Sequence, residues 1–173
     1  MALIYIVEDD ESIREIETIA LKNSGHMVGA FGSSKEFFKK LDEILPDLVL
    51  LDVMLPDESG YDIIKKIRED NNDVPVIFTS ARDKDLDKII GLELGSDDYI
   101  TKPYSPKELV LRVNNIIRRV YTKERQKITY KDYIIDLDKR MAFQGDEDIN
   151  LTTLEFDLLY MFVTNKEKSF SRD

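Results

Sequence analysis

Five short apolar segments alternate with five amphipathic helical patterns over the first 120 residues, and this alternation constrains the fold most strongly. Strands are predicted at 3–7, 27–31, 48–52, 74–80 and 99–101. Each is followed by apolar residues at helical spacing, such as Leu109, Val113 and Ile116 after the fifth strand. Repeated strand-then-helix units favour an α/β fold with a doubly wound parallel sheet and right-handed crossovers. The sequence therefore predicts one such domain over residues 1–120.

Capping signals predict where the helices begin and end. Ser33 with Glu36 and Thr152 with Glu155 have the spacing of capping boxes, and Ser105 precedes Pro106 at a further helix start. Gly25 suits the position after the end of the first helix. That helix, over 12–24, is predicted to have an apolar stripe of Ile13, Ile16, Ile19, Ala20 and Leu21, and the second helix one of Phe37, Phe38, Leu41 and Ile44.

The sequence changes character after position 120. Residues 121–127 are polar and predict a linker, with a frayed helix end as the alternative. Short strands separated by turn residues are predicted at 128–137, 141–143 and 149–151, followed by a strongly apolar helix that begins near Thr152. We therefore expect an antiparallel sheet with one helix in residues 128–173.

Composition narrows the classes of function. The net charge of the 173 residues is −10, and residues 1–119 carry 16 Lys and Arg against 24 Asp and Glu. Such an acidic surface repels phosphate backbones, so bulk charge does not favour nucleic-acid binding. The sequence contains no Cys, no apolar run long enough to span a bilayer and no basic flank at Met1. These features predict a cytoplasmic protein without a membrane partner.

Polar side chains follow four of the predicted strands. Glu8 and Asp9 follow the first, Asp52 ends the third, Ser80 ends the fourth and Lys102 follows the fifth. In a sheet with strand order 2-1-3-4-5 these strand ends surround one crevice. Three carboxylates placed together repel one another unless a cation neutralises them, and Mg²⁺ prefers such ligands.

A phosphoryl group is the substrate that suits this set of side chains. With Mg²⁺ bound, Asp52 stays ionised and one of its oxygens can act as a nucleophile. Lys102 supplies a cation and Ser80 a hydroxyl donor for phosphoryl oxygens. The predicted product is an aspartyl phosphate.

The sequence resembles the receiver domain of two-component response regulators over residues 1–120. The resemblance is carried by Ile6-Val7-Glu8-Asp9-Asp10, Leu51-Asp52-Val53-Met54-Leu55-Pro56, Phe78-Thr79-Ser80-Ala81-Arg82 and Gly95-Ser96-Asp97-Asp98-Tyr99-Ile100-Thr101-Lys102-Pro103-Tyr104. It implies a flavodoxin-like fold and a regulatory phosphoacceptor that is not an enzyme. The implied partner is a sensor histidine kinase that phosphorylates Asp52.

The resemblance also assigns individual residues. It places Glu8 and Asp9 as the acidic Mg²⁺ pair, with Asp52 and the backbone carbonyl of Met54 completing the metal ligands. It implies that Lys102 contacts the phosphoryl group through a segment with a cis Lys102–Pro103 bond. Ser80 and Tyr99 fall at the switch hydroxyl and switch aromatic positions, and the register favours Ser80 over the adjacent Thr79.

The residues after 120 resemble the start of an OmpR/PhoB-type effector, a winged helix preceded by a small antiparallel sheet. The similarity is strongest at Leu151-Thr152-Thr153-Leu154-Glu155-Phe156-Asp157-Leu158-Leu159. The recognition helix of that family would follow Ser171-Arg172-Asp173, so we expect an incomplete effector over 128–173. Promoter DNA is thus the implied target of the full-length relatives, and specific DNA binding is not expected from residues 1–173.

The same subfamily implies a phosphorylation-dependent homodimer through helix four, strand five and helix five. Charged residues at or near the corresponding positions are Lys88, Glu93, Asp97, Asp98, Glu108 and Arg112. Exposed ion pairs of this kind contribute only about 0–1 kcal/mol each to association. Their role would therefore be to set the register and specificity of the dimer more than its affinity.

Two alternatives belong to other functional classes. A Mg²⁺-dependent aspartyl-phosphate phosphohydrolase of the haloacid-dehalogenase type would need a second acid two residues after the nucleophile, where this sequence has Met54. A receiver-like or flavin-binding interaction module without phosphorylation is disfavoured because every acidic position of the receiver is filled. His26 suggests a phosphohistidine carrier, but it is predicted to lie on the surface at the start of the second strand.

Overall fold

The structure is a computed structural model that describes residues 1–70 and 72–164, with the side chains of 123–125 left out of the description. The chain divides into two compact units between Arg118 and Arg119. The two units are described separately below.

The first unit contains a five-stranded parallel sheet with the order β2-β1-β3-β4-β5. Its strands are β1 (Leu3–Val7), β2 (Met27–Phe31), β3 (Leu48–Asp52), β4 (Val76–Ser80) and β5 (Asp98–Thr101). The strands β1, β3 and β4 are apolar along nearly their whole length because helices bury both faces of the sheet. The predicted fold class and strand order are confirmed.

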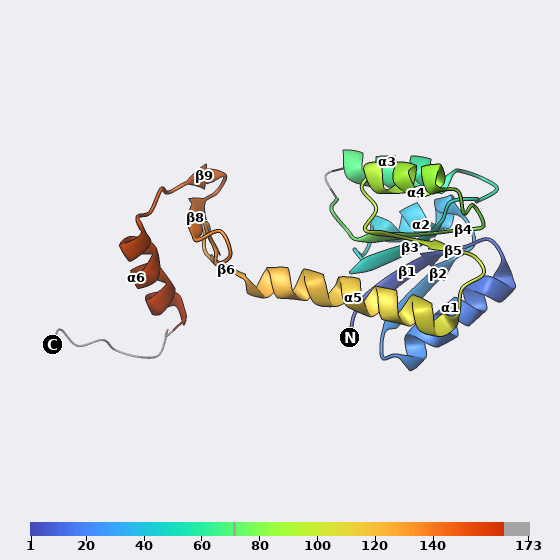
Figure 1. The fold of residues 1–173 in the computed structure, drawn as a ribbon, viewed down its shortest axis with the longest axis horizontal. Coiled ribbons are helices and arrows are strands. Elements are labelled where there is room, and N and C mark those ends of the chain that lie inside the picture. The colour runs from blue at the N-terminus through green and yellow to red at the C-terminus, as the bar shows by residue number, and fades with distance from the viewer. Residues whose placement is uncertain (71, 165–173) are drawn as a thin grey trace. The chain divides into compact units, whose positions relative to one another are not determined.

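Four helices connect these strands, namely α1 (Glu11–Asn23), α2 (Ser34–Leu41), α3 (Gly60–Glu69) and α4 (Asp85–Glu93), and α5 (Pro106–Arg125) follows β5. Figure 1 shows α2, α3 and α4 on one side of the sheet and α1 with α5 on the other. On the first side, Phe37 and Ile64 pack against Val49 and Phe78 in one buried cluster. The order β2-β1-β3 places the topological switch between the carboxyl ends of β1 and β3.

Local hydrogen bonds explain the helix starts. The Ser33 hydroxyl accepts from the Glu36 amide at 3.3 Å, and the Ser105 hydroxyl accepts from the Glu108 amide at 3.1 Å. Gly25 follows α1 with a φ of +89°, a left-handed conformation that glycine adopts without strain. The predicted caps are therefore confirmed.

The predicted stripe of α1 is partly wrong. Ile16 and Ile19 are about half exposed, at 55% and 51%, whereas Glu17 is buried at 2% together with Leu21. Residues 13, 17 and 21 are four apart and share one helix face, and that face packs inward. In α2 the predicted stripe also ends early, because the helix stops at Leu41 and Ile44 is half exposed beyond it.

The second unit holds an antiparallel sheet in the order β6-β7-β8-β9, followed by α6 (Thr153–Thr164). The strands are β6 (Lys127–Tyr130), β7 (Tyr133–Asp136), β8 (Met141–Gln144) and β9 (Glu147–Asp148). Ile135, Ala142 and Phe156 form its buried cluster. The capping box of α6 is present, since the Glu155 carboxylate accepts from the Thr152 amide at 2.8 Å.

Three local predictions for this region need correction. The single strand expected over 128–137 is two strands, because Lys131 turns the chain with a φ of 53°. No strand lies at 149–151, because Asn150 turns the chain there with a φ of 53°, and β8 pairs instead with Glu147 and Asp148. Most of the predicted linker, residues 121–127, is helical, since α5 continues through Arg125. This agrees with the alternative prediction that these residues form the end of a helix.

Within the described residues, no helix combines the length and apolar character needed to cross a bilayer.

Candidate functional site

The strand ends bring three acids together at the switch point. Glu8 and Asp52 are buried, at 1% and 4% exposure, and Asp9 is exposed. One carboxylate oxygen from each lies within 4.8 Å of the others. The acidic cluster predicted from the sequence, Glu8, Asp9 and Asp52, is therefore assembled in the structure.

Local contacts fix the backbone of the acidic turn after β1. Asp10 caps α1 by accepting from the Ile13 amide at 2.9 Å, and the Glu8 carboxylate accepts from the Asp10 amide at 3.1 Å. Arg14 donates through Nη1 to the carbonyl oxygens of Glu8 at 2.7 Å and Asp9 at 3.2 Å. Arg14 is a positioning residue that the sequence analysis missed, although its place one turn into α1 was a usable signal.

Close backbone packing fixes Asp52. Its Oδ1 accepts from the Met54 amide at 2.9 Å. An added Cβ on Gly60 would lie 2.5 Å from the Asp52 carbonyl oxygen, so only glycine fits at the start of α3. The Met54 side chain is 52% exposed, and metal binding by its carbonyl stays a prediction.

Lys102 is the cation that contacts the cluster. Its Nζ lies 2.6 Å from Glu8 Oε2 and 3.0 Å from Asp52 Oδ2, and its side chain is 17% exposed. The peptide bond to Pro103 is cis, which confirms that prediction. Lys102, which follows β5, thus contacts both the acid that follows β1 and the acid that ends β3.

Burial and the neighbouring charges shift the pKa values of Glu8 and Lys102. Burial raises the pKa of Glu8, the hydrogen bond from Lys102 opposes the increase, and the charge of Asp52 reinforces it. Burial lowers the pKa of Lys102, but the hydrogen bond to Glu8 and the charge of Asp52 outweigh it and leave that pKa raised. The cluster therefore favours a bound cation.

The three carboxylates are compatible with a Mg²⁺ site. Two oxygens bound to one Mg²⁺ lie about 3–4 Å apart, because each bond is about 2.1 Å long. The three oxygens here need only a small contraction to reach that spacing. The side chains that line an adjoining hollow include Asp9, Met54, Ser59 and Arg82.

The two predicted switch residues contact the backbone of the same residue, Arg82. Ser80 is fully buried, and its Oγ accepts from the Arg82 amide at 3.1 Å. Tyr99 is 7% exposed and donates through its hydroxyl to the Arg82 carbonyl at 3.2 Å. Thr79 is also buried and pairs in register with Asp52, so the choice of Ser80 over Thr79 stays a prediction.

The charged residues predicted for a dimer face form contacts within the chain. Arg112 binds Asp98 at 2.9 Å and Glu108 at 3.0 Å. The Asp97 carboxylate accepts from the Val76 amide at 3.0 Å and so joins the starts of β4 and β5. Lys88 and Glu93 lie on α4, half-buried and exposed respectively.

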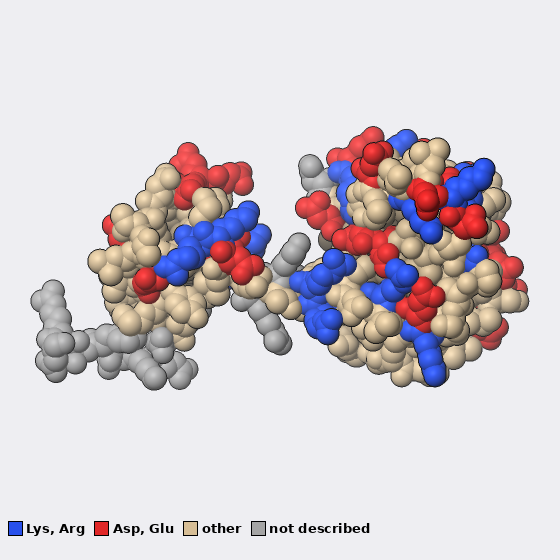
Figure 2. All heavy atoms as spheres, viewed as in Figure 1, with Lys and Arg blue, Asp and Glu red and all other residues tan. Residues whose placement is uncertain are grey.

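His26 lies just before β2, with its Nε2 2.8 Å from the Asn114 side-chain oxygen. The face of the first unit seen in Figure 2 carries acidic and basic side chains intermixed. Neither feature adds a group to the acidic cluster.

Comparisons with known proteins agree with this geometry. The family model of the response regulator receiver domain matches residues 4–114. The transcriptional regulatory protein CssR of Bacillus subtilis is 42% identical over 175 residues, which cover 98% of this chain and 77% of that protein. The DNA-binding response regulator MtrA of Mycobacterium tuberculosis is 38% identical over 170 residues, covering 98% and 74%.

A solved structure of similar extent is that of DrrB, an OmpR/PhoB homolog from Thermotoga maritima. It is 32% identical with a TM-score of 0.64, and the match covers 99% of this chain and 76% of DrrB. The similarity therefore includes residues of both compact units.

Proposed function

Because the chain belongs to the response-regulator family, with a receiver domain and OmpR/PhoB-type relatives, we propose that Asp52 accepts a phosphoryl group from a sensor histidine kinase. The observation that supports this most directly is the contact of Lys102 Nζ with both Glu8 and Asp52. It holds a cation beside a buried carboxylate at the edge of an open hollow. The proposed role is regulatory, with Asp52 as a phosphoacceptor and not as the centre of an enzyme with its own substrate.

The transfer requires one bond to form and one to break. An Asp52 carboxylate oxygen attacks phosphorus, the bond from phosphorus to the histidine nitrogen of the kinase breaks, and that nitrogen retains the electron pair. Lys102 can balance charge on the phosphoryl oxygens, and Ser80 can donate its hydroxyl proton to one of them. Glu8, Asp9, Asp52 and the Met54 carbonyl would hold Mg²⁺, which supplies further charge neutralisation when bound.

The shared contacts with Arg82 suggest how phosphorylation changes conformation. When Ser80 turns its hydroxyl toward a phosphoryl oxygen, it releases the Arg82 amide that it now binds. The Arg82 carbonyl is held by Tyr99, so a movement of the Arg82 backbone also frees the tyrosine ring. We propose that Ser80 and Tyr99 transmit phosphorylation to the face made by α4, β5 and α5.

We propose that this face forms a symmetric homodimer after phosphorylation. Breaking the Arg112 pairs with Asp98 and Glu108 within one chain would make the same groups available to a second copy. Sedimentation of the protein with and without beryllofluoride tests this. An unchanged sedimentation coefficient would contradict the dimer.

The output is proposed to be control of transcription, because two relatives are named as a transcriptional regulatory protein and a DNA-binding response regulator. On this proposal residues 1–120 are the phosphoacceptor domain. The antiparallel sheet, whose first strand β6 begins at Lys127, and α6 are proposed to belong to the effector domain.

Incubation with a phosphorylated histidine kinase domain, with Mg²⁺ or with EDTA, tests the proposed function. We expect a label on this chain that requires Mg²⁺ and that hydroxylamine removes, because acyl phosphates are cleaved by that nucleophile while phosphoserine is not. A label that resists hydroxylamine would place the phosphoryl group elsewhere and refute the assignment.

A further inference from the structure

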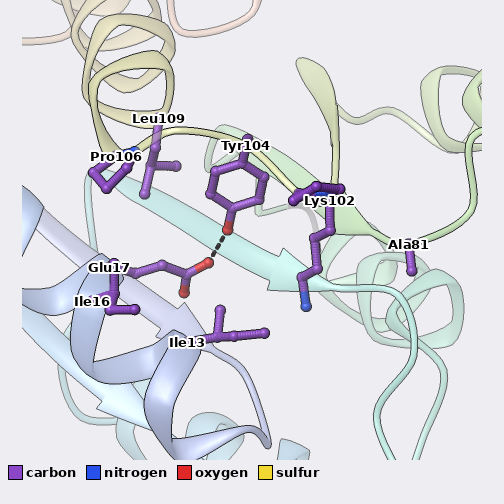
Figure 3. Close-up of a pocket in the computed structure, with 9 residues that line it drawn as sticks. Ile13, Ile16, Glu17, Ala81, Lys102, Tyr104, Pro106 and Leu109 are labelled. Carbon is purple, nitrogen blue, oxygen red and sulfur yellow. Dashed lines mark hydrogen bonds between the residues drawn. The ribbon is translucent and has the colours of Figure 1, made fainter.

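A second group of polar residues lies in a pocket between α1 and the segment that joins β5 to α5. The pocket is shown in Figure 3 and has a volume of about 340 Å³. Its walls are largely apolar, with Ile13, Ile16, Ala81, Pro103, Pro106 and Leu109. One acid, Glu17, extends from α1 among these side chains and is only 2% exposed.

Glu17 is tied to the opposite wall by one contact. Its Oε1 accepts a short hydrogen bond from the Tyr104 hydroxyl, and in Figure 3 the two side chains point toward each other across the pocket. Its other oxygen, Oε2, is buried and has no hydrogen-bond partner in the described part of the chain. A buried carboxylate with one satisfied oxygen is costly in its charged form.

Lys102 connects this pair to the acidic cluster. It lines the same pocket as Glu17 and precedes Tyr104 by two residues, with Pro103 between them. Its ammonium group binds Glu8 and Asp52. Tyr104 therefore holds one end of a short segment whose other end contacts the phosphoacceptor.

We propose that Glu17 and Tyr104 form a buried tether that positions the Lys102 segment, and that ionisation of Glu17 strengthens divalent-cation binding at the Asp52 cluster. The inference rests on the proposed function, because it assigns to these two residues a role at the same site. Glu17 is a positioning residue that acts through charge and through Tyr104.

The groups that face Glu17 explain why its proton is labile near neutrality. Burial raises the pKa of Glu17 to about 7, the Tyr104 hydrogen bond opposes this, and the charge of Glu8 reinforces it. Lys102 lowers that pKa and Asp52 raises it, both through charge, while α5 contributes the apolar Pro106 and Leu109. Below pH 7 the side chain is largely neutral, and above pH 7 it adds a negative charge near Glu8 and Asp52.

The sign of the coupling follows from electrostatics. A negative charge close to the acidic cluster attracts a divalent cation, so cation affinity increases as Glu17 ionises. By linkage, a bound cation stabilises the ionised form of Glu17 and lowers its pKa. The coupling requires no contact between Glu17 and the cation.

A first experiment measures Glu17 directly. The side-chain carboxyl carbons of the intact chain are followed by NMR from pH 4 to pH 9 in the absence of divalent cations. We expect Glu17 to titrate near pH 7. Glu15, an exposed acid on the same helix, provides the reference signal. In Tyr104→Phe the midpoint of Glu17 should increase, because the ionised carboxylate loses its hydrogen bond.

A second experiment measures Mg²⁺ affinity by calorimetric titration at pH 5.5 and pH 8.5. Glu17→Gln keeps an acceptor for Tyr104 but cannot ionise, and Glu15→Gln is the matched control. The Kd of Glu17→Gln should equal that of the wild type at pH 5.5 and exceed it about fivefold at pH 8.5. Glu15→Gln should stay close to the wild type at both values.

The outcomes separate this inference from the proposed function. A Glu17 midpoint below pH 5, or a Kd ratio that does not change with pH while Mg²⁺ binds, overturns the inference alone. Absence of Mg²⁺ binding by the wild type counts against the metal site of the proposed function. In that case the NMR comparison with Tyr104→Phe still decides the tether, because an unchanged Glu17 midpoint would refute it.

Discussion

Replacing Glu17 with Gln should change how the stability of the receiver unit depends on pH. Glu17 has a pKa near 4.5 when unfolded and about 7 when folded. As the pH increases between these values, the unfolded chain releases the proton while the folded chain keeps it, so the free energy of unfolding falls. The difference of about 2.5 pH units, at about 1.4 kcal/mol per unit, gives a total loss of about 3.5 kcal/mol in the free energy of unfolding.

Urea unfolding followed by far-ultraviolet circular dichroism at pH 5.5 and pH 8 measures this effect while avoiding the isoelectric point near 4.7. Part of the decrease in the free energy of unfolding has already occurred at pH 5.5. Between the two pH values the free energy of unfolding of the wild type should therefore fall by about 2 kcal/mol relative to that of Glu17→Gln. Other titrating groups affect both proteins equally, and Glu15→Gln controls for the removal of one acid from α1. Parallel pH dependence in the wild type and Glu17→Gln would refute the assignment of a raised pKa.

Three further substitutions test other contacts of the site. Lys102→Met leaves Glu8 and Asp52 without their cation and should lower the free energy of unfolding of the receiver unit, measured in urea, by about 3 kcal/mol. Millimolar Mg²⁺ should restore part of this stability. Equal stability with and without Lys102 would contradict the ion pairs. Gly60→Ala places a Cβ against the Asp52 carbonyl and should cost about 2 kcal/mol by the same assay, whereas an unchanged urea midpoint would mean that the backbone there relaxes freely. Ser80→Ala should abolish the spectroscopic change that follows beryllofluoride binding, while Thr79→Ala should preserve it; the opposite pattern would reverse the choice of switch residue.

Much of the receiver fold could be predicted from the sequence, because its strands are buried on both faces. The four aliphatic residues from Leu48 to Leu51 predict a strand without any knowledge of what packs against them. This prediction places Asp52 at the end of that strand. The acids after β1 and the lysine after β5 could then be placed at one edge, since parallel strands all present their carboxyl ends there. The structure confirms that Glu8, Asp9, Asp52 and Lys102 lie together.

The features that sequence reasoning missed depend on contacts between distant segments. Glu17 lies on the inward face of α1, although a charged side chain is normally predicted to be exposed. Its burial depends on a hydrogen bond from Tyr104, which lies 87 positions later in the sequence. Ile16 and Ile19 have the spacing of a core stripe, but both are about half exposed. In the second unit, turns with positive φ at Lys131 and Asn150 interrupt apolar segments that otherwise resemble continuous strands.

Phosphorylation of Asp52 is the central claim, and the mass of the intact protein tests it most directly. The wild type and Asp52→Asn are incubated with acetyl phosphate and Mg²⁺, and each is then analysed without digestion. We expect one phosphoryl adduct on the wild type and none on Asp52→Asn, because the carboxamide cannot act as the nucleophile. An unmodified wild type, or an equal adduct on both proteins, would refute phosphorylation at Asp52.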